Sequence, residues 1–217
     1  MESKYNFKEL MKERHSCRKF QSKPIPEETL KDIIAISLNA PSWCNSQPWN
    51  IYVASGNTME EIRKEWISKG KAKVKGYADL KPGHRTDFSE RSQKTMEALF
   101  KSWKDLLNKN EVEESNSFIF NAPTVVYLTL PKGHIPYSIL DLGGLEMSIM
   151  LAAKDHGVDS IPAYSTIMYP DVLRKILKIS EKEDIVIGVA LGYEEKCLLN
   201  DHRSVKLTLD EACHFYN

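Results

Sequence analysis

The stretch from Tyr137 to His156 reads YSILDLGGLEMSIMLAAKDH. If it is wound into a helix, apolar side chains lie on nearly every side of it. A helix that is apolar all round is buried all round. In a chain of 217 residues this pattern predicts a central helix, or a helix that a second subunit covers.

Other helices and strands alternate on both sides of this stretch. Thr124–Leu130 is rich in β-branched residues, and Asp184–Gly192 is apolar enough to be a central strand. Local signals also predict a strand at Trp49–Ala54 and helices at Phe7–Glu13, from Pro26 to about Asn39, and at Pro170–Leu177. The alternation by itself indicates a layered domain of α/β type.

Residues 57–116 form a long charged stretch that is broken by Lys81-Pro82-Gly83. We expect helices here, including a long one from about Ser89 to Asn108, and a mobile connection around residues 76–85. The stretch is expected to be a lid or an excursion packed on the core. Composition alone does not decide between these two alternatives.

Composition excludes several classes of protein. Thirty Lys and Arg residues balance thirty Asp and Glu residues, so the whole chain does not attract nucleic acid or acidic membranes. The apolar runs are too short to cross a bilayer, and the charged start leads into no signal core, so we expect a cytoplasmic protein. The scattered cysteines and histidines form no metal motif, which predicts reduced thiols and no metal.

The best candidate for a ligand site is Arg14-His15-Ser16-Cys17-Arg18. In an extended segment, Arg14, Ser16 and Arg18 project from one side of the backbone. Two guanidinium groups and one hydroxyl there suit a phosphate-sized anion. The sequence has neither a Walker A loop nor a GxGxxG motif, which disfavours a P-loop or Rossmann nucleotide site.

Taken in order, the motifs resemble those of the FMN-dependent nitroreductase family. Arg14–Arg18 resembles its R-x-S-x-R phosphate motif, and Ala40–Trp49 resembles its A-P-S-x-x-N-x-Q-P-W loop. The family order continues with Asp141-Leu142-Gly143, Ile187–Tyr193 and a tail from Asn200 through Arg203 and Lys206 to Glu211. The resemblance covers nearly the whole chain.

This resemblance implies that residues 1–217 are one FMN-binding domain of the α+β class. Helices would flank a mainly antiparallel central sheet in three layers. It also implies a homodimer with two FMN sites at the subunit interface. These expectations come from the family and not from the periodicity of the chain.

The resemblance also assigns roles to residues. Arg14 and Ser16 would bind the FMN phosphate, with Arg203 and Lys206 as a second basic pair. Arg18 would lie further along the cofactor, where a cation near flavin N1 and O2 raises the reduction potential. The alternative for all four basic residues is a solvated or ion-paired surface charge. His15 lies inside the motif, where we favour a structural role.

The remaining expected contacts lie in two other segments. Amide and hydroxyl groups suit the polar edge of the flavin ring and the ribityl chain, to which the family resemblance assigns Pro41, Ser42, Trp43, Asn45 and Gln47. Turn formation explains part of this loop, and core packing is an alternative for Trp43 and Trp49. A backbone N–H at Ala163 or Tyr164 would meet flavin N5.

The implied activity is that of a ping-pong oxidoreductase. NADH or NADPH would reduce FMN, and a small-molecule acceptor such as a nitroaromatic or quinone would then take the electrons. No catalytic side chain is expected, because the flavin performs the chemistry. The alternatives are a non-catalytic flavin-binding or sensor protein, and a flavoenzyme of the same fold that performs dehalogenation or flavin breakdown. A nucleic-acid-binding module is disfavoured by the balanced charge.

Overall fold

The computed structural model describes residues 6–106 and 109–216. Its strands form one sheet in the order β1-β2-β4-β3, and every neighbouring pair is antiparallel. The strands are β1 (Asn50–Ser55), β2 (Thr124–Pro131), β3 (Asp159–Ala163) and β4 (Glu183–Gly192). The predicted α+β class is therefore confirmed, whereas the α/β type suggested by alternation alone would have required parallel strands.

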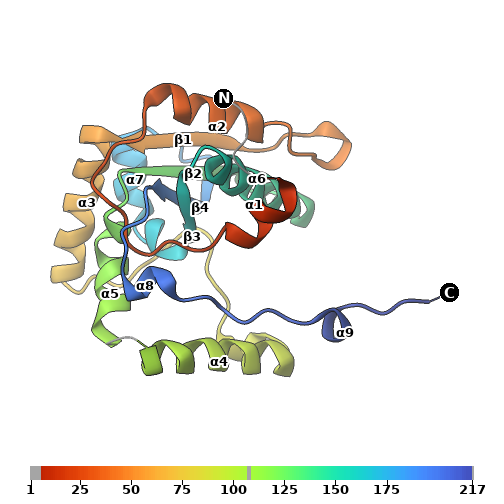
Figure 1. Ribbon diagram of the computed structural model, residues 1–217. Coiled ribbons are helices and arrows are strands. Elements are labelled where there is room, and N and C mark those ends of the chain that lie inside the picture. Colours follow the sequence, from red (N-terminus) through yellow and green to blue (C-terminus); the bar gives the residue numbers. More distant parts are fainter. Residues whose placement is uncertain (1–5, 107–108, 217) are drawn as a thin grey trace.

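Helices surround this sheet (Figure 1). Most of them lie close to the predicted residues, since local signals mark their ends. The α-helices are α1 (Phe7–Glu13), α2 (Glu27–Ser37), α3 (Gly56–Lys71), α4 (Glu90–Leu106), α5 (Lys109–Ser117), α6 (Pro136–Asp155), α7 (Pro170–Leu177), α8 (Leu198–Asp201) and α9 (Leu209–Ala212). Short 3-10 turns are η1 (Trp43–Asn45), η2 (Arg85–Asp87), η3 (Ile119–Asn121) and η4 (Tyr164–Thr166).

The central strand β2 divides the interior into two cores. Val125 and Tyr127 join α3 and α7 in one core, whereas Val126 and Leu128 join α2 and α6 in the other. Successive side chains of a strand point to opposite faces of the sheet, so β2 is covered on both sides. The fold therefore has three layers, with the sheet in the middle.

Helix α6 is covered on one side only within this chain. Leu145 and Ile149 are completely buried towards the sheet, while Tyr137 and Leu140 are 50% and 69% exposed. A single chain therefore does not bury the helix on all sides. The expectation of a helix buried on every side within one chain is therefore wrong.

The charged stretch contains two structurally different parts. Met59, Ile62 and Trp66 of α3 are buried in the core. Helix α4, in contrast, lies apart from the layers and beside the C-terminal tail (Figure 1), where the Arg91 guanidinium donates to the Glu211 carbonyl at 2.8 Å. Asn108, the predicted end of the long helix, lies outside the described residues.

Strand β3 was not predicted, because it is short and contains Pro162. Proline is tolerated on an edge strand, and β3 is the edge of this sheet. On the outer side of β3, Ser16 forms a parallel bridge with Ser160, whose carbonyl accepts the Cys17 N–H at 3.0 Å. The predicted anion-binding segment therefore lies along the sheet edge.

Candidate active site

Arg18 and Arg203 lie close enough together for the charge of Arg203 to act on the Arg18 guanidinium. Burial lowers the pKa of the Arg18 guanidinium, and the positive charge of Arg203 lowers it further. Each guanidinium donates to a backbone carbonyl, that of Ser16 and that of His202 respectively. Within the described part of the chain, neither pairs with a carboxylate. Two like charges without a counter-ion favour binding of an anion.

The side chain of Asn200 holds these two distant segments together. Its Oδ1 accepts the backbone N–H groups of Arg18 and Lys19 at 2.6 and 3.2 Å. Its Nδ2 donates to the carbonyls of Lys19 and Glu195 at 2.7 and 2.8 Å. Because Asn200 is completely buried, these four bonds satisfy the whole amide. Sequence analysis included Asn200 only as the start of the tail and missed this role.

The other members of the first motif lie beside this pair. Burial lowers the pKa of Arg14, whose guanidinium has no hydrogen-bond or ion-pair partner among the residues described. His15 is buried, with Nδ1 2.9 Å from the Glu13 carbonyl and Nε2 3.2 Å from Glu194 Oε1. Those contacts fit the structural role expected for His15. Ser16 is half-buried in the bridge to β3.

Helix α4 contacts this cluster, which the sequence did not indicate. The Trp103 ring lies 5.1 Å from the Arg18 guanidinium, and its Nε1–H donates to His202 Nδ1 at 3.4 Å. His202 Nε2 lies 2.9 Å from the Ser102 hydroxyl. Burial lowers the pKa of His202, and the charges of Arg18 and Arg203 lower it further. A neutral imidazole therefore fixes α4 beside the arginines.

Asp141, in the first turns of α6, holds the loop of residues 41–48. Both of its carboxylate oxygens accept the Trp43 N–H, at 3.0 and 3.1 Å, and one lies 3.4 Å from the Ser46 hydroxyl. Cys44, Asn45 and Gln47 have positive φ angles of 47°, 57° and 41°. Such angles are costly for residues other than glycine, so the surrounding bonds must impose them.

The side chains of this loop face outwards. Trp43 is 57% exposed and lies against Tyr137, with 4.8 Å between ring centroids. Core packing is therefore wrong for Trp43, although it is confirmed for Trp49, which is 8% exposed. Asn45 and Gln47 are exposed, with one amide bond between them at 3.1 Å. Pro41 is exposed and Ser42 is half-buried, its hydroxyl accepting the Gln47 N–H at 3.0 Å.

The structure brings together only part of the predicted site. Ala163 and Tyr164 stand at the end of β3, the strand that Ser16 bridges, so they share an edge with the first motif. Lys206 is exposed, and its ammonium donates to the Ser204 hydroxyl at 3.0 Å. It forms no hydrogen bond with a residue of the first motif in the described ranges. Among the hydrogen bonds of residues 6–106 and 109–216, none joins the 41–48 loop to Arg14–Arg18.

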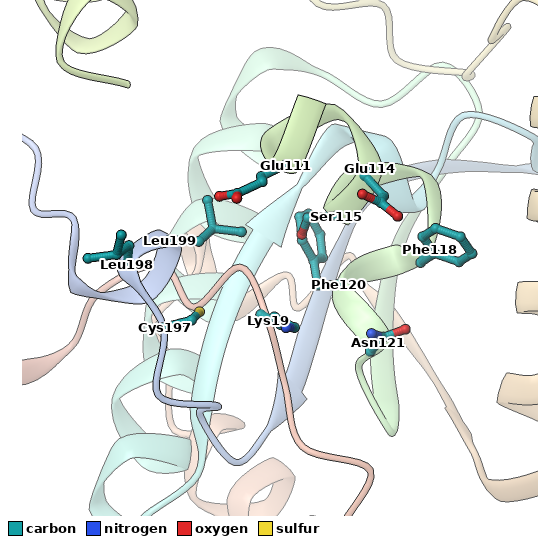
Figure 2. Close-up of a pocket in the computed structure, with 10 residues that line it drawn as sticks. All are labelled: Lys19, Glu111, Glu114, Ser115, Phe118, Phe120, Asn121, Cys197, Leu198 and Leu199. Carbon is teal, nitrogen blue, oxygen red and sulfur yellow. The ribbon is translucent and has the colours of Figure 1, made fainter. Parts of the chain in front are cut away.

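A separate cavity of about 460 Å³ opens between α5, η3 and α8 (Figure 2). Lys19 forms part of its wall, but the residues predicted to contact FMN do not line it. No metal-binding group of three or more His, Cys, Asp or Glu side chains occurs in the described ranges. None of the helices in residues 6–106 and 109–216 is both long enough and apolar enough to span a membrane.

Known proteins resemble this chain over almost its full length. Nitrobenzene nitroreductase of Ectopseudomonas oleovorans is 29% identical over 217 residues, covering 95% of each chain. The 4-nitrobenzoate reductase of Pseudomonas putida is 26% identical and covers 97% of this chain and 95% of its own.

Solved structures agree on the fold. The crystal structure of the FMN-dependent nitroreductase NfnB from Mycobacterium smegmatis in complex with NADPH superposes with a TM-score of 0.89, at 24% identity and 97% coverage of both chains. The sequence profile of the Nitroreductase family matches residues 11–193, which include the first motif, the loop and all four strands. The chain therefore belongs to the nitroreductase family.

Proposed function

We propose that this protein is an FMN-dependent oxidoreductase that passes reducing equivalents from NADH or NADPH to a nitroaromatic, quinone or similar flat acceptor. The observation that carries the proposal is the pair Arg18 and Arg203, which lies without a counter-ion at the β3 edge in a chain of the nitroreductase family. The named reductases of nitrobenzene and 4-nitrobenzoate support the nitroaromatic class of acceptor.

The residues at this edge fit an FMN phosphate. A partly buried phosphate carries nearly two negative charges and needs cations and donors. Arg14, Arg18 and Arg203 have no carboxylate partner in the described ranges, and burial weakens the hydration of two of them. Arg14, Ser16 and Arg203 would bind the phosphate, and Arg18 would favour the reduced state of the ring. Lys206 would join them through movement of the exposed tail.

When bound, FMN supplies the redox chemistry, since it accepts hydride from the nicotinamide and passes electrons to the acceptor. The chain would position the cofactor through the residues of the first motif and the 41–48 loop. The family assigns the N5 contact to a backbone N–H at Ala163 or Tyr164. Because the flavin would supply the redox chemistry, we assign no acid–base pair or nucleophile to the chain.

A homodimer would complete the site. Apolar side chains on or directly beside α1, α2 and α6 are exposed, and a second copy would bury them, namely Phe7, Met11, Ile36, Leu38, Tyr137 and Leu140. Trp43 belongs to the same end of the molecule, because its loop is fixed to Asp141 on α6. The 41–48 loop of one subunit would then reach the flavin held by the arginines of the other. Free thiols at all four cysteines are consistent with a cytoplasmic location.

An absorption spectrum and a turnover assay test the proposal. The purified protein should be yellow or take up added FMN, and it should oxidise NADPH or NADH faster when nitrofurazone or menadione is present. A colourless protein that ignores FMN would refute the proposal. A bound flavin without turnover would favour the sensor alternative instead.

A further inference from the structure

The cavity beside α5 has a rigid apolar floor. Phe120 is buried there, and Ile119, Phe120 and Asn121 have consecutive positive φ angles of 51°, 57° and 56°. The Phe120 carbonyl accepts the Phe20 N–H at 3.0 Å, and the Arg63 guanidinium donates to the Phe118 carbonyl at 3.4 Å. These bonds hold an unfavourable turn in place, so the floor is formed before any ligand arrives.

The walls of this cavity carry an unbalanced negative charge. Lys19 is paired with Glu195 at 2.8 Å and is therefore already neutralised. The hydrogen bond and charge of Glu195 raise the pKa of Lys19, and the charge of Glu111 raises it further. Glu111 and Glu114 themselves have no ion-pair or hydrogen-bond partner for their carboxylates in residues 6–106 and 109–216. Figure 2 shows both side chains above the aromatic floor.

From this combination we propose that the cavity is a second binding site, distinct from the flavin site, for an organic cation with an aromatic or branched apolar body. Two carboxylates without partners would meet the positive charge, while Phe118, Phe120 and Leu199 would bury the apolar body. Aromatic faces also attract cations, which favours quaternary or protonated amines over metal ions. The volume of about 460 Å³ is within the range of small-molecule pockets.

The same features argue against other occupants. An anion would meet Glu111 and Glu114 with Lys19 already engaged by Glu195. Glu111 and Glu114 are exposed to solvent at the rim of the cavity, so a neutral apolar molecule would gain nothing from their charge. A cation with an apolar body is the ligand that would use both the negative charge of the rim and the aromatic floor.

The wall of the cavity is continuous with the segment that carries Arg18. Ser115, on α5, donates its hydroxyl to the Arg18 carbonyl, and Lys19 is bonded to Asn200 through both backbone groups. A ligand in the cavity would therefore rest on residues adjacent to the arginine pair. The binding test is for this reason carried out both with and without FMN.

Titration with benzyltrimethylammonium, followed by proton NMR, tests the proposal. The probe is added to the protein as purified and again with saturating FMN, and its neutral isostere neopentylbenzene is titrated in parallel. We expect saturable binding of the cation in both states, and markedly weaker binding of the isostere. The double variant Glu111→Gln and Glu114→Gln should weaken cation binding about five- to thirtyfold.

Glu113→Gln is the matched control, because Glu113 is exposed on the same helix but does not line the cavity. It should leave the affinity unchanged. The proposal is overturned if the cation does not bind, if the double variant binds it like the unmodified protein, or if the isostere binds equally well. Failure of FMN uptake would bear on the proposed function alone, since cation binding is read independently of it.

Discussion

The buried carboxamide of Asn200 accepts the backbone N–H of Arg18 at 2.6 Å, although 182 positions separate the two residues in the chain. The same side chain bonds Lys19 and Glu195. The segment that carries Arg203 is thereby fixed against the segment that carries Arg18. We therefore expect the spacing of the two guanidinium groups to depend on this amide.

Replacing Asn200 with Ala should therefore affect stability and ligand binding together. It leaves the N–H groups of Arg18 and Lys19 without their acceptor, which costs on the order of 1–3 kcal/mol in the free energy of unfolding. FMN affinity should also fall, because the arginines are no longer held together. Urea denaturation and FMN titration measure the two effects. Unchanged FMN affinity in a destabilised but folded variant would show that the hydrogen bonds of Asn200 do not position the arginines for FMN.

Arg14→Ala should weaken FMN binding. Loss of one charge-assisted contact to a phosphate costs roughly 1.5–3 kcal/mol, which corresponds to a ten- to hundredfold higher Kd. Fluorescence titration with FMN measures the change. Lys12→Ala, an exposed cation of α1, is the control and should leave the Kd almost unchanged. Equal effects of the two variants would place the phosphate elsewhere.

Asp141→Ala should release the 41–48 loop. A hydrogen bond to a charged group contributes about 1.5–3 kcal/mol, and the positive φ angles of Cys44, Asn45 and Gln47 would then relax. We expect a lower Tm and altered Trp43 emission, since the indole is largely exposed against Tyr137. Asp141→Asn keeps one acceptor oxygen and should show a smaller change. An unchanged Tm and unchanged Trp43 emission in the Ala variant would contradict the proposed role of Asp141.

Stability should decrease as the pH falls below the ordinary pKa of histidine, because of His202. The folded protein lowers the pKa of His202 through burial and the charges of Arg18 and Arg203. The unfolded chain then binds the proton more tightly, so this contribution to stability is complete above a pH of about 6.5 and is lost as the pH falls from there through the lower pKa of the folded protein.

Chemical denaturation near neutral pH and about two pH units lower measures the effect. His202→Gln should reduce the pH dependence of unfolding. His156 does not confound the comparison: burial alone would lower its pKa, but its bonds to Asp32 and the Ala152 carbonyl raise it, and this shift is common to both proteins. Identical pH dependence in the two proteins would exclude a role for His202.

Gly192→Ala should destabilise the fold. A Cβ at this position would stand 2.7 Å from Pro123 Cδ and 2.8 Å from Phe20 Cδ1, and Phe20 is almost completely buried. Overpacking of this kind costs about 1–3 kcal/mol. Gly70→Ala is the matched control, because nothing lies within 4 Å of its Cβ, and it should be neutral or stabilising. Thermal unfolding of both variants provides the comparison.

Local signals in the sequence predicted most of the elements. The helices Phe7–Glu13 and Pro170–Leu177 were predicted at the observed bounds, since entry and exit residues mark them. Strand β3 has only five residues, one of them Pro162, so no periodicity distinguishes it. The antiparallel direction of the strands was predicted from the family resemblance and not from the pattern of helices and strands.

The site was less accessible to sequence analysis. Asp141 left a usable signal, because a carboxylate in an apolar helix must find donors. Asn200 left none, since its partners are defined only when the ends of the chain meet. The contacts of Trp103 and His202 likewise depend on where α4 comes to rest. The roles of Arg14, Ser16, Ala163 and Lys206 towards FMN stay predictions.

The bridge between Ser16 and Ser160 has a consequence for solubility. An open edge strand offers its backbone groups to other chains, and here the first motif covers part of that edge. Proteolytic trimming of the N-terminus beyond Phe20 would remove the segment that we propose binds FMN and would uncover this part of the β3 edge at once. We therefore expect a protein trimmed in this way to aggregate more readily than the full chain.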